Sequence, residues 1–551
     1  MKLNKYLMLI AASALTLTAC DDYLDVASEN TLTTDSFWGS PAQLEQGLNG
    51  VYHDLIPAAY HMYYLGELPS DNNYFEWDTE RTWDRLAAHD GNIQNLDELN
   101  NAWVDYFKCI AHANTFIENA GRVSGFKDEV NGESAIRNQM IGEAYFIRAI
   151  SYFELVQAFG RIPVFTKTLS NAEAIDPAVG GQKEPKVAYD QVVEDLKTAE
   201  SMLNNAPTDY RGTAVAGKPT QIAAKAMLGR VYLTMATHPD YKGGDSYKEQ
   251  AASKLKEVLD AVGASGTPNK YWAKTAEEWG SMFLHENDNK YYIFELQYAT
   301  DAAKTLGNTA IFEMQPEVRN GKFYPVRIFG NKIFVMNDLL EAYGHPKDEN
   351  GNWVSSYGNG NGNADMRADW TVCYLSGNDL VNDQTGSGYS GNPFYTKFLE
   401  TTPKREHYGK TALPLVYDDY YKDEINFPVI RLEDVMLMYC EIKGCNAETL
   451  HLYNLIHGRA TGNELSQAEA SANWDALIKL ERRLEFAQEG IRWHDMVRRG
   501  ETLEKKTLLQ TYTTGFATQA IGVYTDYYRF AIPQNQINVK DGLYTQNPEY
   551  K

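Results

Sequence analysis

The sequence has 551 residues and a formal net charge of −23 at pH 7. This length is enough for one large domain, or two intimate domains, with a sizeable core. An acidic protein repels polyphosphates and anionic lipid surfaces, so nucleic acid is excluded as a favoured partner.

The N-terminus has the order of residues that is typical of a secretory signal. Lys2 and Lys5 precede an apolar run, and Leu17-Thr18-Ala19 stands directly before Cys20. This pattern matches a lipobox, so we expect residues 1–19 to be removed and Cys20 to be acylated, for example with palmitate. A soluble secreted protein with a chance cysteine is the alternative. Acyl chains would anchor the protein stably, because each buried CH₂ contributes about 0.8 kcal/mol.

Helical periodicity then returns in blocks. Ser40-Pro41 is a favourable helix start, and apolar residues on one face predict a helix over 42–55. Residues 56–94 lose this periodicity and are predicted to form a loop that is dense in aromatic and amide side chains. Further helices are expected over 96–120, 137–159, 189–203, 221–236 and 247–262.

The segment 137–164 carries apolar or small side chains on every face, which predicts a buried central helix. Gly160 should end this helix, and Pro163 should force an extended exit. Glu143, Arg148 and Glu154 then need partners, because an unpaired charge in such surroundings costs several kcal/mol.

An irregular region follows, from Tyr271 to about Phe427, with a strand-like run at Tyr291–Tyr298. The helical pattern resumes over 431–444, 447–457, 473–489 and 491–499. Helix pairs joined by short loops indicate an all-α fold built on tetratricopeptide-like hairpins. We expect a single domain over 20–551, with a helical frame at about 40–262 and 431–500 and a loop-rich ligand-side lobe at about 263–430.

The other four cysteines, Cys109, Cys373, Cys440 and Cys445, have neither CxxC spacing nor nearby histidines. A zinc site is therefore not predicted, and packed free thiols are expected. No cofactor is predicted either.

Several blocks together resemble the SusD/RagB family of outer-membrane nutrient-binding lipoproteins. They occur in the family order along nearly the whole mature chain, although each block alone would be weak. The blocks are Cys20 followed by Asp-Asp-Tyr-Leu, Thr34–Trp38, Gly142–Ala149 continuing through Phe159–Pro163, Pro219-Thr220, Arg431–Val435, Glu481–Met496, Ile532-Pro533 and Gln546–Pro548.

The resemblance implies a SusD-like protein held by its lipid on the outer face of the outer membrane. Such a protein would capture an oligosaccharide, or a peptide as in RagB-like relatives, and deliver it to a SusC-like TonB-dependent transporter. The family blocks describe the frame and say little about the ligand.

Catalysis has no positive support in the sequence. Glu481, Glu485 and Glu489 recur every four residues among arginines, which favours salt-bridged helix faces over a pair of glycosidase carboxylates. His494 and Asp495 lack a partnered serine or cysteine in any signature context. The protein is therefore predicted not to be an enzyme.

The segment His345–Trp353 holds carboxylate and amide oxygens that could bind calcium. It lacks the spacing of an EF-hand, so a polar turn is favoured.

A sugar-binding protein needs flat aromatic rings with carboxylate, amide or guanidinium groups beside them. Two segments supply this mixture, although packing onto the helices is the alternative for each residue. The first predicted wall is Asp71, Asn72, Asn73, Trp77, Arg81 and Trp83, and the second is Trp353, Tyr357, Asn359, Arg367 and Trp370. Tyr298 and Tyr324 are weaker candidates.

Four functions remain open at this point. The first is a glycan-binding protein partnered with a transporter. The second is peptide capture by the same fold, and removal of Lys2 and Lys5, which takes the net charge from −23 to −25, would favour basic peptides. The third is a surface glycoside hydrolase, and the fourth is a helical scaffold without a ligand.

Overall fold

A computed structural model of the protein describes residues 37–75, 85–86, 92–284, 291–299, 308, 333–354, 364–374, 393–411, 424–501, 511–514, 517–520 and 528–551. The predicted signal and Cys20 lie outside these residues. So do Trp77, Arg81, Trp83, Tyr324, Tyr357 and Asn359.

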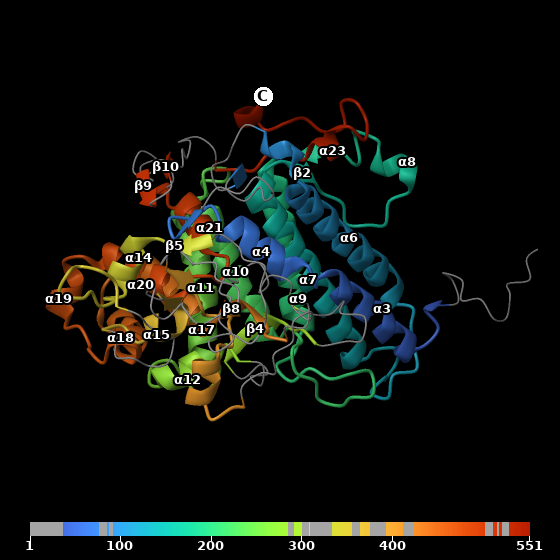
Figure 1. Cartoon of the computed structure of the whole chain (residues 1–551). Helices are drawn as coiled ribbons and strands as arrows, with labels where there is room; N and C mark the ends of the chain where they lie inside the picture. Colours follow the sequence, from blue (N-terminus) through green and yellow to red (C-terminus); the bar gives the residue numbers. More distant parts are fainter. Residues whose placement is uncertain are drawn as a thin grey trace, which may run out of the picture.

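The main body is a stack of α-helices, as predicted, in which helices that are close in sequence pack against one another (Figure 1). The packing runs from α3 to α6, α7, α9, α10 and α11, and then to α17 and α18. The bounds of these helices are Pro41–Asp54 (α3), Asp97–Ala120 (α6), Ala135–Phe159 (α7), Pro185–Met202 (α9), Gln221–Thr237 (α10), Asp245–Ala261 (α11), Leu432–Lys443 (α17) and Ala447–Thr461 (α18).

The helix α7 lies at the centre of this stack and is buried along almost its whole length. The Ser134 side chain caps its N-terminus, and Gly160 ends it with a φ of 69°. Arg148 donates to Asp195 at 2.6 and 2.8 Å, and Glu143 accepts from Tyr52 at 2.9 Å. Two of the three charged residues thus have the partners that we expected.

Three differences from the predicted helices have local causes. The segment 56–94 was predicted as a loop, but Ala58–Gly66 forms a further helix, α4. The helix α9 begins at Pro185, because proline is favoured in the first helical turn. The helix α20 (Trp474–Glu485) ends four residues early, because Gln488 and Gly490 take φ values of 69° and 73°. It is followed by α21 (Arg492–Arg498).

Short antiparallel strand pairs join distant segments. The predicted strand forms as β4 (Tyr292–Leu296) and pairs with β8 (Phe427–Arg431). The other pairs are β1 (Asn73–Phe75) with β5 (Ile333–Val335), β2 (Ile162–Pro163) with β3 (Gln182–Lys183), β6 (Val372–Cys373) with β7 (Phe394–Tyr395), and β9 (Thr511–Thr514) with β10 (Ala517–Ala520).

A second, smaller core lies in the irregular lobe. Val335, Leu340 and Tyr343 pack there with Leu484 and Ala487. Tyr343 also donates from its hydroxyl to the Leu484 carbonyl at 2.7 Å. The lobe is therefore held against α20. Its short helices are α12 (Ala276–Ser281), α14 (Asn337–Ala342), α15 (Ala368–Thr371) and α16 (Thr402–His407).

The remaining short helices are α8 (Asn171–Ala174), α19 (Gln467–Ser471) and α23 (Gln534–Ile537), with 3₁₀ turns at Ile93–Asn95 and Pro548–Tyr550. Among the described residues, no helix combines the length and the apolar character that crossing a membrane requires. Cys109, Cys373, Cys440 and Cys445 are free thiols, as predicted. Burial raises the pKa of the Cys109 thiol to about 12.

The contact between α4 and the turn before α21 gives the first testable prediction. A Cβ atom on Gly66 would lie 1.7 Å from the carbonyl oxygen of Gly490. We expect Gly66→Ala to lower the free energy of unfolding by about 1–3 kcal/mol, because a backbone atom blocks the added methyl group. Urea denaturation measures this change.

Gly50→Ala is the matched control. Gly50 lies in α3, and no atom is within 4 Å of its Cβ position. This variant should be neutral or up to about 1 kcal/mol more stable, because alanine favours a helix. Equal stability of the two variants would contradict the close packing of α4.

Candidate ligand-binding site

A buried network of arginines and carboxylates underlies the predicted site. Glu485 accepts from Arg367 at 2.9 Å, from Arg431 at 3.0 Å and from Arg459 at 2.8 Å. Arg431 also donates to Glu489 at 2.8 Å. These guanidinium groups hold the pKa of the Glu485 carboxyl well below its ordinary value despite burial. The predicted ion pairing of these glutamates is present, but their partners are Arg367, Arg431 and Arg459 of other segments and not the neighbouring arginines of α20.

The first three residues of the first predicted wall are buried in the protein. Asp71, Asn72 and Asn73 are buried, with exposed fractions of 8%, 0% and 2%. Arg492 donates to both oxygens of Asp71 at 2.8 and 2.9 Å, and Arg483 donates to Asn72 Oδ1 at 2.8 Å. The sequence predicts that these three side chains face a ligand, but their polar groups bind internal partners. They anchor the base of the loop, and Trp77, Arg81 and Trp83 continue from it outside the described residues.

The second predicted wall is also partly internal. Arg367 is bound to Glu485 and Asp365, and Trp370 is buried against His407 and Tyr408. The expected ligand-facing position is therefore not found for these two residues, because burying Arg367 requires carboxylate partners inside the protein. The half-buried Trp353 has the Lys347 ammonium 4.2 Å from its ring centre. Tyr357 and Asn359 follow it outside the described residues.

The base of the first wall lies beside the segment that supports Trp353, whose ring nitrogen donates to Asn337 at 3.2 Å. β1 pairs with β5 so that Asn73 is opposite Val335, and the Met336 amide donates to the Asn72 carbonyl at 3.0 Å. Arg483 joins the same segments, because it donates to the Asp71 carbonyl at 3.0 Å and to Asp338 at 3.2 Å. The structure thus brings together two segments that are about 260 residues apart in sequence.

A cavity of about 240 Å³ lies at the other end of α4. It is enclosed by α3, the loop 216–218 and β4, and α4 connects it in sequence to the base of the first wall. Its lining combines two tyrosine rings and apolar side chains with amide, ammonium and carboxylate groups. The polar and aromatic members are Asn49, Tyr52, Lys218, Glu295, Gln297 and Tyr298.

This cavity has the mixture of groups that we sought in a sugar site. Lys218 lies 3.3 Å from the buried Glu143 carboxylate, and Tyr298 donates to the Ile56 carbonyl at 2.8 Å. Burial, together with the neighbouring Glu143 carboxylate, raises the pKa of the Tyr52 hydroxyl well above its ordinary value, so this group stays neutral. Sequence reasoning had singled out only Tyr298, because Asn49 and Tyr52 belong to a helix with ordinary amphipathic spacing.

The segment His345–Trp353, a candidate calcium site in the sequence, forms the favoured polar turn. Asp348 Oδ1 accepts from the backbone amides of Asn350 and Asn352, at 2.9 Å each. These two bonds give the Asp348 carboxylate a structural role within the turn.

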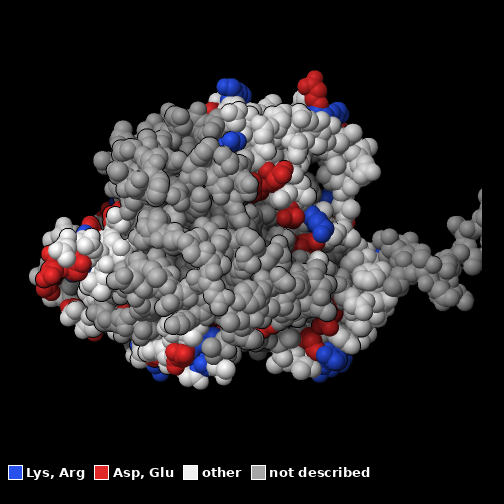
Figure 2. Space-filling view, viewed as in Figure 1, with Lys and Arg blue, Asp and Glu red and all other residues white. Residues whose placement is uncertain are grey.

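On the face shown in Figure 2, acidic side chains gather at the edge formed by α19, and basic ones stand singly or in small groups.

The helical stack and the loops gathered on it define an all-α, tetratricopeptide-like protein with a loop-rich lobe. The family described as “Starch-binding associating with outer membrane” matches residues 22–233, and the “SusD family” matches residues 290–550. The chain belongs to the SusD/RagB family.

Similar proteins match nearly the whole chain. A SusD-like protein P38 from Formosa agariphila is 23% identical, over 90% of this chain and 91% of its own length. A SusD-like protein from Bacteroides ovatus is 24% identical, over 94% of this chain and 86% of its own length.

Two solved structures share the fold. A SusD homologue from Bacteroides thetaiotaomicron has a TM-score of 0.70 and 20% identity, covering 95% of this chain and 100% of that chain. A structure described as a laminarin-binding SusD-like protein has a TM-score of 0.64 and 21% identity, covering 93% of this chain and 100% of that chain.

Asp71 and Asp338 both bind arginines near the first wall, and the same substitution at each compares a buried ion pair with an exposed one. Asp71→Asn leaves Arg492 buried without its carboxylate, so we expect a loss of about 3–5 kcal/mol in the free energy of unfolding. Asp338→Asn should cost less than about 1 kcal/mol, because the Asp338 side chain is 47% exposed. Urea denaturation compares the two variants, and a similar loss in both would argue against the buried anchor.

The buried carboxyl of Glu67, directly after α4, should make the free energy of unfolding depend on pH. Burial raises the pKa of its carboxyl from 4.5 to about 7, although the hydrogen bond from Asn72 opposes the rise. Its contribution to stability is therefore complete below about pH 4.5 and is lost as the pH rises through about 7. Glu67→Gln stays neutral and should flatten the fall in unfolding free energy between about pH 5 and about pH 8.

The exposed Glu464→Gln is the control for this experiment. It should leave the pH profile of the unfolding free energy unchanged. A Glu67→Gln profile that follows the wild type across this range would show that Glu67 does not carry the effect.

Proposed function

We propose that this protein is a non-enzymatic, lipid-anchored binding protein of the cell surface that captures an oligosaccharide and delivers it to a SusC-like TonB-dependent transporter. The observation that carries the proposal is the pairing of β1 with β5 at one end of α4, with the cavity of about 240 Å³ at the other end. The first predicted loop follows β1, and Trp353 of the second wall donates from its ring nitrogen to Asn337, two residues after β5. The family match and the laminarin-binding relative support a glycan as the ligand.

The cavity suits one part of a sugar chain. The C–H face of a pyranose ring packs on aromatic rings such as those of Tyr52 and Tyr298, and its hydroxyl groups hydrogen-bond to amides such as Asn49 and Gln297. The loops that contain Trp77, Trp83, Tyr357 and Asn359 are proposed to hold the rest of the ligand.

Calorimetric titration of the mature protein tests the proposal. Laminarin-derived and starch-derived oligosaccharides are titrated first, and a set of basic peptides follows. We expect heat with at least one glycan, and at least a tenfold weaker affinity for Trp77→Ala and for Trp83→Ala, because loss of a stacking ring costs about 1.4 kcal/mol or more. Tyr247→Ala on α11, which lies outside the cavity and both loops, is the control.

The other functions predict different results with the same ligands, in the titration or in a separate assay for reducing sugar. Heat with peptides alone would favour RagB-like peptide capture, and release of reducing sugar would favour a hydrolase. No heat with any ligand would favour a scaffold and would count against the proposal.

The lipid anchor has its own test in the native cell. Cys20→Ser should abolish labelling with radioactive palmitate and move the protein from the membrane fraction to the soluble fraction, because the acylated thiol is lost. Cys445→Ser, which removes a half-buried free thiol, should change neither. An unlabelled wild-type protein in the soluble fraction would refute the anchor.

A further inference from the structure

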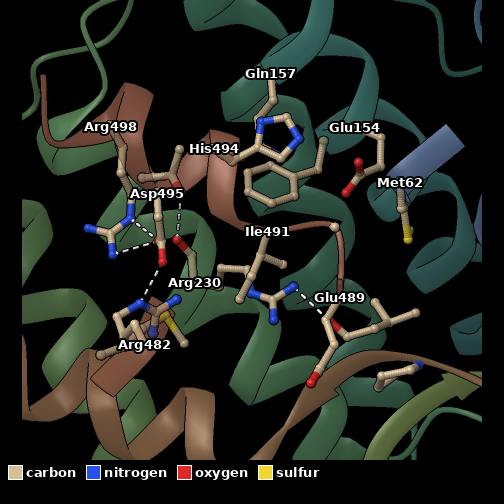
Figure 3. A pocket seen from close by; sticks show the side chains of 16 residues that line it. Met62, Glu154, Gln157, Arg230, Arg482, Glu489, Ile491, His494, Asp495 and Arg498 are labelled. Carbon is tan, nitrogen blue, oxygen red and sulfur yellow. Dashed lines mark hydrogen bonds and ion pairs between the residues drawn. The ribbon is translucent and has the colours of Figure 1, made fainter. Parts of the chain in front are cut away.

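A smaller cavity of about 40 Å³ lies between α7, α10 and α21. It shares no lining residue with the cavity at Tyr52 and Tyr298. Figure 3 shows Glu154 and Gln157 of α7 and His494 of α21 around the same space.

Most charged groups around this cavity are paired. Arg482 and Arg498 donate to Asp495 at 2.6 and 2.9 Å, and Arg230 donates to Asp434 at 2.6 Å. Glu489 is bound to Arg431. These groups form a wall that is already satisfied by protein partners.

Three polar side chains are the exception. Within the described part of the chain, the Glu154 carboxyl, the Gln157 amide and the His494 ring make no hydrogen bond or ion pair, and His494 Nε2 is buried without a partner. Gln157 is 93% buried, since its exposed fraction is 7%. Leaving a buried polar group unsatisfied costs about 1–3 kcal/mol, so the buried His494 Nε2, beside the two other polar side chains of this space, indicates an occupant.

The volume of the cavity and the charges of its lining side chains indicate which occupant fits. A water molecule needs about 10–15 Å³ of such volume, so the cavity holds about three. An organic ligand needs several times more room. A bare cation is disfavoured because Arg230, Arg482 and Arg498 all line the cavity. Burial also lowers the pKa of His494 to about 3 and raises that of Glu154 to about 7, so the imidazole is neutral and the carboxyl is readily protonated.

We propose that this cavity is a permanent internal water site, in which about three ordered water molecules bridge Glu154, Gln157 and His494. Each water then finds the two to four polar partners that stable internal water requires. The water cluster completes the contact between α7 and α21, where direct side-chain bonds are missing. The site also touches Met62 of α4 and Gly490, and so lies beneath the helix that leads to the ligand loops.

A crystal structure of the mature wild-type protein, at a resolution that shows ordered solvent, tests the site directly. We expect about three density peaks within hydrogen-bond distance of the three side chains. In solution, oxygen-17 relaxation dispersion should detect long-lived internal water. This signal should fall in Glu154→Leu and be retained in Glu154→Gln, which keeps a polar partner.

Thermal unfolding of the two variants gives an independent result. If the cavity is hydrated, Glu154→Leu leaves water without a partner and melts at a lower temperature than Glu154→Gln. If the cavity is dry, leucine replaces an unsatisfied carboxyl and melts at the higher temperature, which overturns the proposal.

The same measurement tests for an ion. Dialysed wild-type protein is melted with sodium, potassium, ammonium, magnesium, calcium or zinc chloride at constant ionic strength. The proposal expects equal melting temperatures in all six salts. A rise with one cation that is lost in Glu154→Gln overturns it in favour of an ion site.

Discussion

The fold depends on one buried carboxylate. Glu485 of α20 accepts hydrogen bonds from Arg367 of the lobe, Arg431 at the end of β8 and Arg459 of α18, and from the Trp279 ring nitrogen at 2.7 Å. Charges at this depth cost several kcal/mol each when a partner is missing, so these segments are stable only together. The irregular lobe is therefore an integral part of the helical body.

The helical body was largely predictable because its sequence follows simple rules. Local signals located α3, α7 and α10 to within one or two residues: Ser40 precedes α3, Gly160 ends α7, and Thr220 precedes α10. The helix α4 was missed because it has only 9 residues, fewer than the window of about 11–18 residues in which a helical pattern can be recognised. The early end of α20 depends on a positive φ at Gln488, which no local pattern indicates.

The site was predictable in its chemistry but not in its geometry. The density of aromatic and amide residues pointed to the segments around Asp71 and Trp353. The structure joins them through Met336, whose amide donates to the Asn72 carbonyl, and through Asn337, which accepts from the Trp353 ring nitrogen. The inward direction of Asp71 and Arg367 was not predictable, because it is decided by partners hundreds of residues away. A side chain that can bind a sugar hydroxyl can equally bind a buried arginine, and only the tertiary packing chooses between them.

The backbone contacts of Asn72, which join β1 to the segment after β5, have a consequence for the evolution of such a protein. The Asn72 carbonyl accepts from the Met336 amide at 3.0 Å and from the Tyr395 hydroxyl at 2.9 Å. Main-chain groups carry little dependence on residue identity, so substitutions farther along either loop leave these contacts intact. Ligand preference can then diverge between gene copies while folding stability is retained.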